Sequence, residues 1–282
     1  MPTKFENCPI ILKPQVKITD SFEDIFIMAN SITINDQLPI AQIRRLGREG
    51  AYAGRAESPV QGQLSIDFVY GEMSVFVDGV KIYSPSKSWF DNLTGKVEYI
   101  DAFIGPYQFS SGLLTDFSFS SEPNSIVNTS IGFVFYNSEL SKLDSPVIEQ
   151  QYFSGVGHGV YSSGDFSDPT IGSNQNSFSF SYNLSQGFEP VRYAGQVSPA
   201  IIKRTDGEIT FNIQGDDLAN GLTTSPDSLC KDRINEANFF ITGLCNNNFG
   251  DKYTVKGYIQ DREISIVEGD IVRGSLKIID YF

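Results

Sequence analysis

The chain has 282 residues and a formal net charge of −13, from 21 basic and 34 acidic side chains. Because a surface that clamps phosphates needs lysine and arginine to displace counterions, this balance argues against tight binding of nucleic acid; it is equally typical of a protein that its charge keeps soluble. The 22 Phe, 13 Tyr and 25 Gly predict a mainly β protein, because aromatic side chains pack well on a pleated sheet and glycine marks turns.

The cysteines and the apolar runs bear on the compartment. Cys8, Cys230 and Cys245 are odd in number and dispersed, which favours reduced thiols in a cytosol over a disulfide framework. No stretch approaches the roughly 20 apolar residues of a membrane span, and the apolar run at 10–12 is too short for a signal-peptide core. We therefore expect a soluble chain that is made in a cytoplasm and has no membrane partner.

The N-terminal half predicts an arm and then a β-domain. Residues 1–20 contain Pro2, Pro9 and Pro14, which we expect to prevent regular strand pairing, so the segment is predicted to be an arm. A first domain over 21–137 follows, with alternating strand patterns at 32–34 and 64–68.

A hairpin is predicted at 73–83. Its central dipeptide is Asp78-Gly79, between Val77 and Val80, and it supplies the positive φ that a type I′ turn requires. A short helix is expected at 84–93, where Ser84 caps the first turn and Pro85 lies within it.

The C-terminal half repeats this order. After strand patterns at 115–119 and 131–136, glycine clusters predict a connector over 138–176. The second domain, 177–282, opens with the alternating strand 178–182 and has a second short helix expected at 225–237.

Two blocks of sequence occur twice, in the same order and about 145 residues apart. Residues 52–68 (YAGR, SP, GQLSIDF) resemble 193–213 (YAGQ, SP, GEITFNI), and 126–136 resembles 271–281. Such internal similarity predicts a tandem duplication of one β-domain, each copy a sandwich or barrel with one short helix.

The chain lacks a recognisable catalytic set. The single histidine, His158, lies between glycines and has no orienting partner nearby in sequence, so we expect a loop residue. Asp216 and Asp217 are adjacent and predict a solvated turn rather than a cation site. We expect no enzyme, no metal site and no cofactor.

Alternation along the strands predicts a polar face. Apolar residues recur on one side of each strand, and small, polar or acidic residues lie on the other. An ordinary antiparallel sheet facing water has this pattern, as does a dedicated polar surface. The candidate residues of this face are Ser65, Asp67, Asp116, Ser118, Thr210, Asn212, Glu263 and Ser265.

Together these features resemble the tail tube proteins of long-tailed bacteriophages. The similar segments are 32–34, the loop 52–59, 64–68, the helix 84–93 and the closing strand 131–136, all repeated in the second half.

In that family six domains close into a ring around a lumen, and the rings stack into a tube through which DNA leaves the capsid. The resemblance implies a virion protein assembled in the host cytoplasm, with three duplicated chains in each ring. It also implies that the eight polar residues line the lumen, and that the hairpin at Val77, Asp78, Gly79 and Val80 joins neighbouring subunits, as does the N-terminal arm. The partners would be further copies of the chain, other tail proteins, and genomic DNA in transit that is not specifically bound. The connector departs from the pattern of a single-domain tube protein.

Two alternatives stay open. A trimeric baseplate hub or tube initiator would share the duplication but would not stack on itself. A tandem β-sandwich that binds carbohydrate would show exposed aromatic residues clustered on one face.

Overall fold

The protein is mainly β, as its composition predicts, with one helix among the described residues. The computed structural model describes residues 9–15, 24–37, 40–43, 53–56, 61–77, 80–82, 87–122, 127–136, 141–142, 166–168, 172–174, 177–193, 198–215, 233–242, 250–265 and 273–282.

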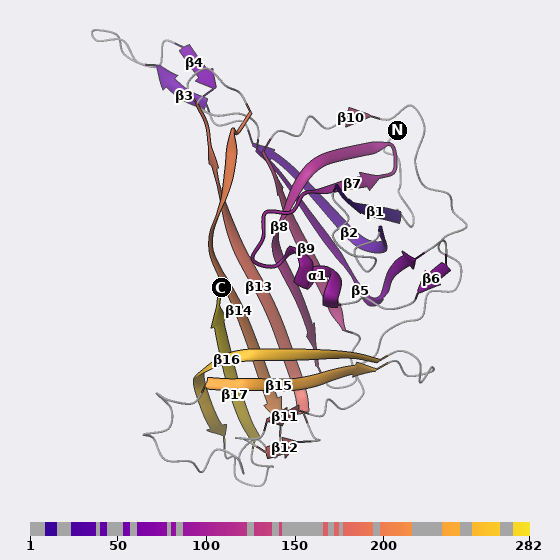
Figure 1. Ribbon diagram of the computed structural model, residues 1–282, viewed down its shortest axis with the longest axis vertical. Coiled ribbons are helices and arrows are strands. Elements are labelled where there is room, and N and C mark those ends of the chain that lie inside the picture. Colours follow the sequence, from indigo (N-terminus) through magenta and orange to yellow (C-terminus); the bar gives the residue numbers. More distant parts are fainter. Residues whose placement is uncertain are drawn as a thin grey trace.

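Six strands of the first half close an antiparallel barrel in the order β8-β7-β1-β2-β5-β9 and back to β8 (Figure 1). Its inside is lined by alternate apolar residues, such as Leu64, Ile66 and Phe68, which are buried as the strand period predicts. The strands are β1 (Pro9–Pro14), β2 (Ile25–Gln37), β5 (Gln61–Val77), β7 (Ile100–Ile104), β8 (Tyr107–Ser121) and β9 (Asn128–Phe135).

Strand β1 corrects one expectation. The prediction that prolines prevent pairing in the N-terminal segment is wrong for 9–14, because these residues pair with β2 on one side and β7 on the other. Pro9 and Pro14 stand at the two ends of the strand, where a missing N–H costs least. Ile10 and Leu12 between them are fully buried. This part of the expected arm therefore closes the chain's own barrel.

The barrel continues into a second sheet through β8. One edge of β8 pairs with β7 over residues 107–112 and then with β13 over 116–121, while β9 follows the opposite edge. From β13 the sheet runs in the order β13-β14-β17-β16-β15-β11-β12 (Figure 1). These strands are β13 (Ser177–Val191), β14 (Ile201–Gly215), β17 (Arg273–Tyr281), β16 (Gly250–Ser265), β15 (Arg233–Thr242), β11 (Phe166–Asp168) and β12 (Gly172–Asn174).

The strand order β2-β5-β9-β8-β7 of the first half recurs in the second as β13-β14-β17-β16-β15. The repetition extends to single residue pairs. The pairs between β8 and β9 from residue 113 to 120 recur between β16 and β17 with both numbers higher by 145, one-residue bulge included. For example, Leu114 opposite Phe133 corresponds to Ile259 opposite Ile278.

The same comparison places β14 147 residues after β5, and β13 148 after β2. The alignment of 62–68 with 207–213 from sequence is therefore two residues out of step. A shift of two keeps every side chain on its face, so the polar and apolar sides are unaffected.

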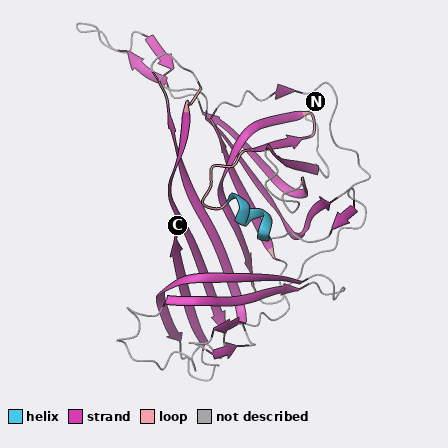
Figure 2. Cartoon of the chain, viewed as in Figure 1, coloured by secondary structure: helices cyan, strands magenta, loops and turns pink. Residues whose placement is uncertain are grey.

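Helix α1 (Lys87–Leu93) lies within the segment predicted to be helical and is shown in Figure 2. It buries Trp89, Phe90 and Leu93, and the ring of Phe90 stacks on Phe117 of β8 with 3.9 Å between ring centroids. The helix therefore packs on the apolar side of β8, close to the point where β7 and β13 diverge.

The side chain of Gln186 on β13 links β13 to β8 and to the end of α1 by hydrogen bonds. Its Nε2 donates to the carbonyl oxygens of Leu114, at 2.7 Å, and Leu93, at 3.2 Å, and its Oε1 accepts from the Gly95 amide at 2.9 Å. Gln186 is buried, so it satisfies three backbone groups where water has little access.

The second expected helix is wrong for residues 233–237, which belong to strand β15. The apolar spacing of Leu229, Ile234 and Phe239 is compatible with a helix, but the run Phe239-Phe240-Ile241 favours a strand, and pairing with β16 decides the outcome. Residues 225–232 lie outside the described part of the chain.

Short strands complete the description. The expected connector contributes β10 (Ser141–Lys142), which pairs with β8, and it also contains β11 and β12, so these residues are not all loop. The predicted hairpin is confirmed as β5 paired with β6 (Val80–Ile82), with Val77 opposite Val80; Asp78 and Gly79 lie outside the described residues. Strands β3 (Ile40–Ile43) and β4 (Ala53–Ala56) form a separate two-stranded sheet (Figure 1).

Candidate functional site

The polar sides of the strands from both halves join into one surface, which we call the polar face. Residues that are directly opposite on neighbouring antiparallel strands lie on the same side of a sheet, so the pairing defines the face across β2, β5, β9, β8, β13, β14, β17 and β16. One row of opposed residues consists of Ser31, Asp67, Ser130, Ser118, Asn183, Thr210 and Ile279. The next rows contain Thr33, Ser65, Gly132, Asp116, Ser185 and Glu208 on one side, and Asn128, Ser120, Ser181, Asn212, Lys277 and Asp261 on the other.

All eight residues predicted from alternation occupy positions on this one face. Asp67, Asp116 and Glu263 are exposed, and the hydroxyl and amide residues are half-buried between them. Glu263 and Ser265 belong by register to the β16 end of the face, opposite Ser275 and Arg273. The side chain of Ser265 is outside the described part of the structure.

Hydrogen bonds between neighbouring strands fix several of these side chains. The Ser31 hydroxyl donates to the Asp67 carboxylate at 2.5 Å. The Asn212 amide donates to the Ser181 hydroxyl at 3.0 Å. Thr210 donates to Glu208, two residues earlier on the same strand, at 2.8 Å. The face is therefore an ordered polar surface rather than a set of independent side chains.

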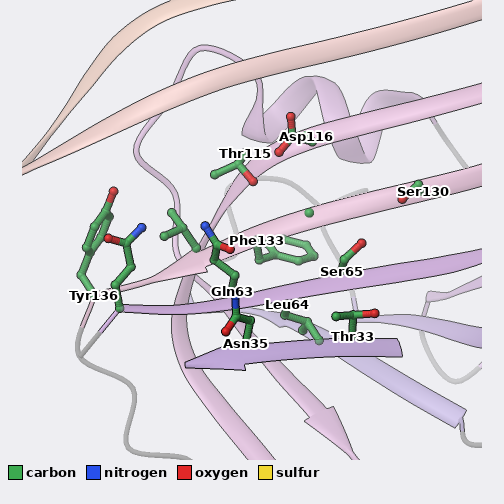
Figure 3. A pocket seen from close by; sticks show the side chains of 13 residues that line it. Thr33, Asn35, Gln63, Leu64, Ser65, Thr115, Asp116, Ser130, Phe133 and Tyr136 are labelled. Carbon is green, nitrogen blue, oxygen red and sulfur yellow. The ribbon is translucent and has the colours of Figure 1, made fainter. Parts of the chain in front are cut away.

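The structure adds residues that the sequence reasoning missed. A hollow in the face lies over β2, β5, β9 and β8, with Thr33, Asn35, Gln63 and Ser130 among its lining residues (Figure 3). Its lining includes Gly132, where an added Cβ would meet the side chains of Thr115 and Asp116 at 3.1 Å. The alternation of Ser31, Thr33 and Asn35 with Ile32 and Ile34 is the local signal that places β2 on the face.

The charge of the face is mostly negative. The described rows carry the carboxylates of Asp67, Asp116, Glu208 and Asp261, and the ammonium group of Lys277 lies among them. Lys277 was not among the candidate residues of the face, and its place there follows from its position opposite Asn212. Opposite it on the other side lies Asp261, so the positive charge has an acidic neighbour.

The described residues contain no cluster of candidate metal ligands. Among them, no three His, Cys, Asp or Glu side chains gather where they could hold a metal ion, and no helix has the length and apolar character to cross a membrane. His158, Asp216 and Asp217 lie outside the described ranges. Burial raises the pKa of the Tyr136 phenol, which donates to the carbonyl oxygen of Phe188 at 2.8 Å.

Comparison with known proteins gives no further assignment: no protein-family model matches this chain, and no curated protein matches its sequence.

Proposed function

We propose that this chain is a structural subunit of a phage tail tube, in which three copies form a ring of six similar domains and the polar face lines the lumen. In this proposal the two halves are copies of one tube domain, and DNA passes along the face without specific binding.

The observation that carries the proposal is the continuity of the polar face across both halves. A duplicated domain could bury its two polar sides against each other or point them in different directions, but here β8 and β13 pair so that the sides merge. A wall made of many such domains needs this continuity, since each junction between domains must keep the same side of the sheet toward the lumen.

The repeated pairing supports the count of domains. Strand order and residue register recur between the halves, so each chain offers two similar units to an assembly. Six similar units then require three chains.

The charge supports DNA passage without retention. Carboxylates repel the phosphate backbone over about 8–10 Å at physiological ionic strength. The hydroxyl and amide groups between them carry no positive charge, so few groups on the face would bind phosphate tightly.

Electron microscopy of the purified full-length protein tests the assembly. Stacked tubes with three chains per ring are the expected result. Rings that never stack would favour the hub or initiator alternative, and a monomer at all concentrations would contradict a tube.

Lysine substitution tests the lumen assignment. Asp116→Lys should leave assembly intact, because the position is exposed, but the resulting tubes should retain DNA at low salt and release it at high salt. Asp91→Lys makes the same charge change on α1, which packs on the opposite side of β8, and should retain no DNA. Equal DNA retention by the two variants would contradict the assignment of the face to the lumen.

A carbohydrate-binding module has one observation in its favour, since Tyr258 and Tyr281 are exposed on the second half. Glycan-array binding that is lost in a Tyr258→Ala, Tyr281→Ala variant would support this function instead.

A further inference from the structure

Two strand edges end without a neighbour among the described residues. Strand β2 pairs with β1 only through residues 25–28, so the same edge carries no described strand from residue 29 to 37. Strand β16 pairs with β15 only through residues 250–258, and the same edge carries none from 259 to 265. Unpaired edges of this length are sites at which another strand can add.

These two edges correspond to the pair that joins the halves within the chain. The internal junction consists of β8 residues 116–121 and β13 residues 180–185. The residues of β16 that correspond to 116–120 are 261–265, and the residues of β2 that correspond to 180–185 are 32–37. The open edges of β2 and β16 are thus the two complementary sides of a junction that β8 and β13 already form within the chain.

The exposure of Ile34 agrees with a missing neighbour. Ile34 lies opposite the buried Leu64, on the apolar side of β2, yet it is 40% exposed. Its counterpart Tyr182 is 4% exposed, because it stacks on Phe119 across the internal junction with 4.9 Å between ring centroids. Within the described structure, no strand plays the part of β8 for Ile34.

A second apolar cluster shows the same contrast. In the first half, Leu113 and Tyr136 are buried with Val134 under Phe188 and Ile202 of β13 and β14. Their counterparts 145 residues later are Tyr258 and Tyr281, which are 51% and 63% exposed.

We propose that a second copy of this chain repeats the internal junction between chains: β2 of one copy adds antiparallel to the open edge of β16 of the next. The inference rests on the proposed ring and names the contact that closes it. The internal register predicts the following opposed positions: Thr33 with Ser265, Ile34 with Ile264, Asn35 with Glu263, Asp36 with Arg262, and Gln37 with Asp261.

The chemistry of these five pairs is complementary. The register sets an acid opposite a base, an apolar residue opposite another, two amides opposite carboxylates, and one hydroxyl residue opposite another. A slip of two residues toward lower numbers on β16 would set Ile34 opposite Arg262 and Asp36 opposite Gln260, which loses both the apolar and the charged pair.

The two-stranded sheet of β3 and β4 extends the same contact between copies. These two strands lie between β2 and β5 in the chain. The corresponding position in the second half is the outer end of the hairpin that β13 and β14 form (Figure 1). The outer ends of β13 and β14 carry Phe188 and Ile202, which pack on the apolar cluster of the first half. By the same geometry, β3 and β4 of the added copy would pack on Tyr258 and Tyr281.

Cysteine pairs in the full-length chain test the register. Directly opposed residues of antiparallel strands have Cα atoms about 4.5–5.5 Å apart, within the range that a disulfide spans. A mixture of the Asn35→Cys and Glu263→Cys chains should form, on mild oxidation, an intermolecular disulfide between positions 35 and 263, identified by peptide mass spectrometry.

The test has a positive control and an out-of-register control. The corresponding internal pair, Ser118→Cys with Asn183→Cys in one chain, should form an intramolecular disulfide. Asn35→Cys mixed with Asp261→Cys is two residues out of register and should give at least ten-fold less product. Equal yields from 35–261 and 35–263, or no 35–263 product in assembled protein, would overturn the proposal.

The same samples separate this inference from the proposed function. Cross-linked rings that never stack would contradict the tube and leave the junction standing, whereas tubes without the 35–263 disulfide would contradict the junction alone. As a second measurement, Ile34→Lys should keep the parent circular dichroism, because the side chain is exposed, and should weaken assembly at least ten-fold. Unchanged assembly of a folded Ile34→Lys protein would also overturn the proposal.

Discussion

The two halves share one strand order but complete it differently. In the first half, β1 fits between β7 and β2 and closes a barrel. In the second half, β11 pairs with β15 as β1 does with β7, but its other neighbour is β12. Strand β13 pairs with β8 through residues 180–185, which correspond to residues 32–37 of β2, beyond the part of that edge that β1 covers.

The difference shows how one pattern of strands can serve two purposes. The first half covers its β2 edge with its own N-terminal strand only through residues 25–28, and the second half uses the edge of β13 that corresponds to 32–37 to attach itself to β8. The apolar core is continuous across this attachment, with Phe117 and Phe119 of β8 contacting Tyr182 of β13. Stability of the second half should therefore depend on the junction more than on its own closure.

Loss of Gln186 should have the largest effect on this comparison. Gln186→Leu removes three buried hydrogen bonds, those to the Leu93 and Leu114 carbonyl oxygens and that from the Gly95 amide, which should cost about 3–5 kcal/mol in the free energy of unfolding. Urea denaturation measures this cost. The matched change Gln214→Leu, at an exposed position of the neighbouring strand, should stay within about 0.5 kcal/mol. Similar costs for the two variants would show that the junction is not a stability centre.

Corresponding tyrosines should respond unequally. Tyr136→Ala removes a buried ring and its hydrogen bond to Phe188, and should cost about 3 kcal/mol. Tyr281→Ala, 145 residues later, should cost less than about 0.5 kcal/mol in the isolated chain, because the ring is exposed. Both are measured by urea denaturation at a concentration where the chain is monomeric. A cost for Tyr281→Ala as large as that of Tyr136→Ala would mean that the second cluster is already covered within one chain.

Alkaline pH should have the smallest effect. Burial raises the pKa of the Tyr182 phenol above its ordinary value, and Asp91 and Asp280 raise it further. Because the unfolded phenol ionises near pH 10 while the folded one stays protonated, this contribution is fully present below about pH 10 and is lost as the pH rises above it.

At pH 11 the loss should be about 1 kcal/mol, and Tyr182→Phe should remove it. Stability is compared at pH 8 and pH 11 by urea denaturation. Parent and variant that lose equal stability between these pH values would contradict the assignment to Tyr182, since the raised pKa of Tyr136 acts in both proteins.

Much of the polar face could be read from the sequence, and its extent could not. Alternation placed Ser65 with Asp67 and Thr210 with Asn212, because successive residues of a strand point to opposite faces whatever the neighbouring strands are. The hollow at Gly132 and the position of Lys277 depend on which residues are opposite one another, and register between strands far apart in sequence leaves no local signal.

The sequence by itself determined the mainly β class, the two sides of its strands, the hairpin at Val77 and Val80, and a short helix that contains Trp89. These features depend on neighbouring residues, through alternation, turn chemistry and capping. Only the tertiary structure decided that β1 closes a barrel despite its prolines, that residues 233–237 form a strand, and that β8 joins the two polar sides into one face. Those outcomes depend on which strand edges are left to pair, and that is fixed when the whole sheet assembles.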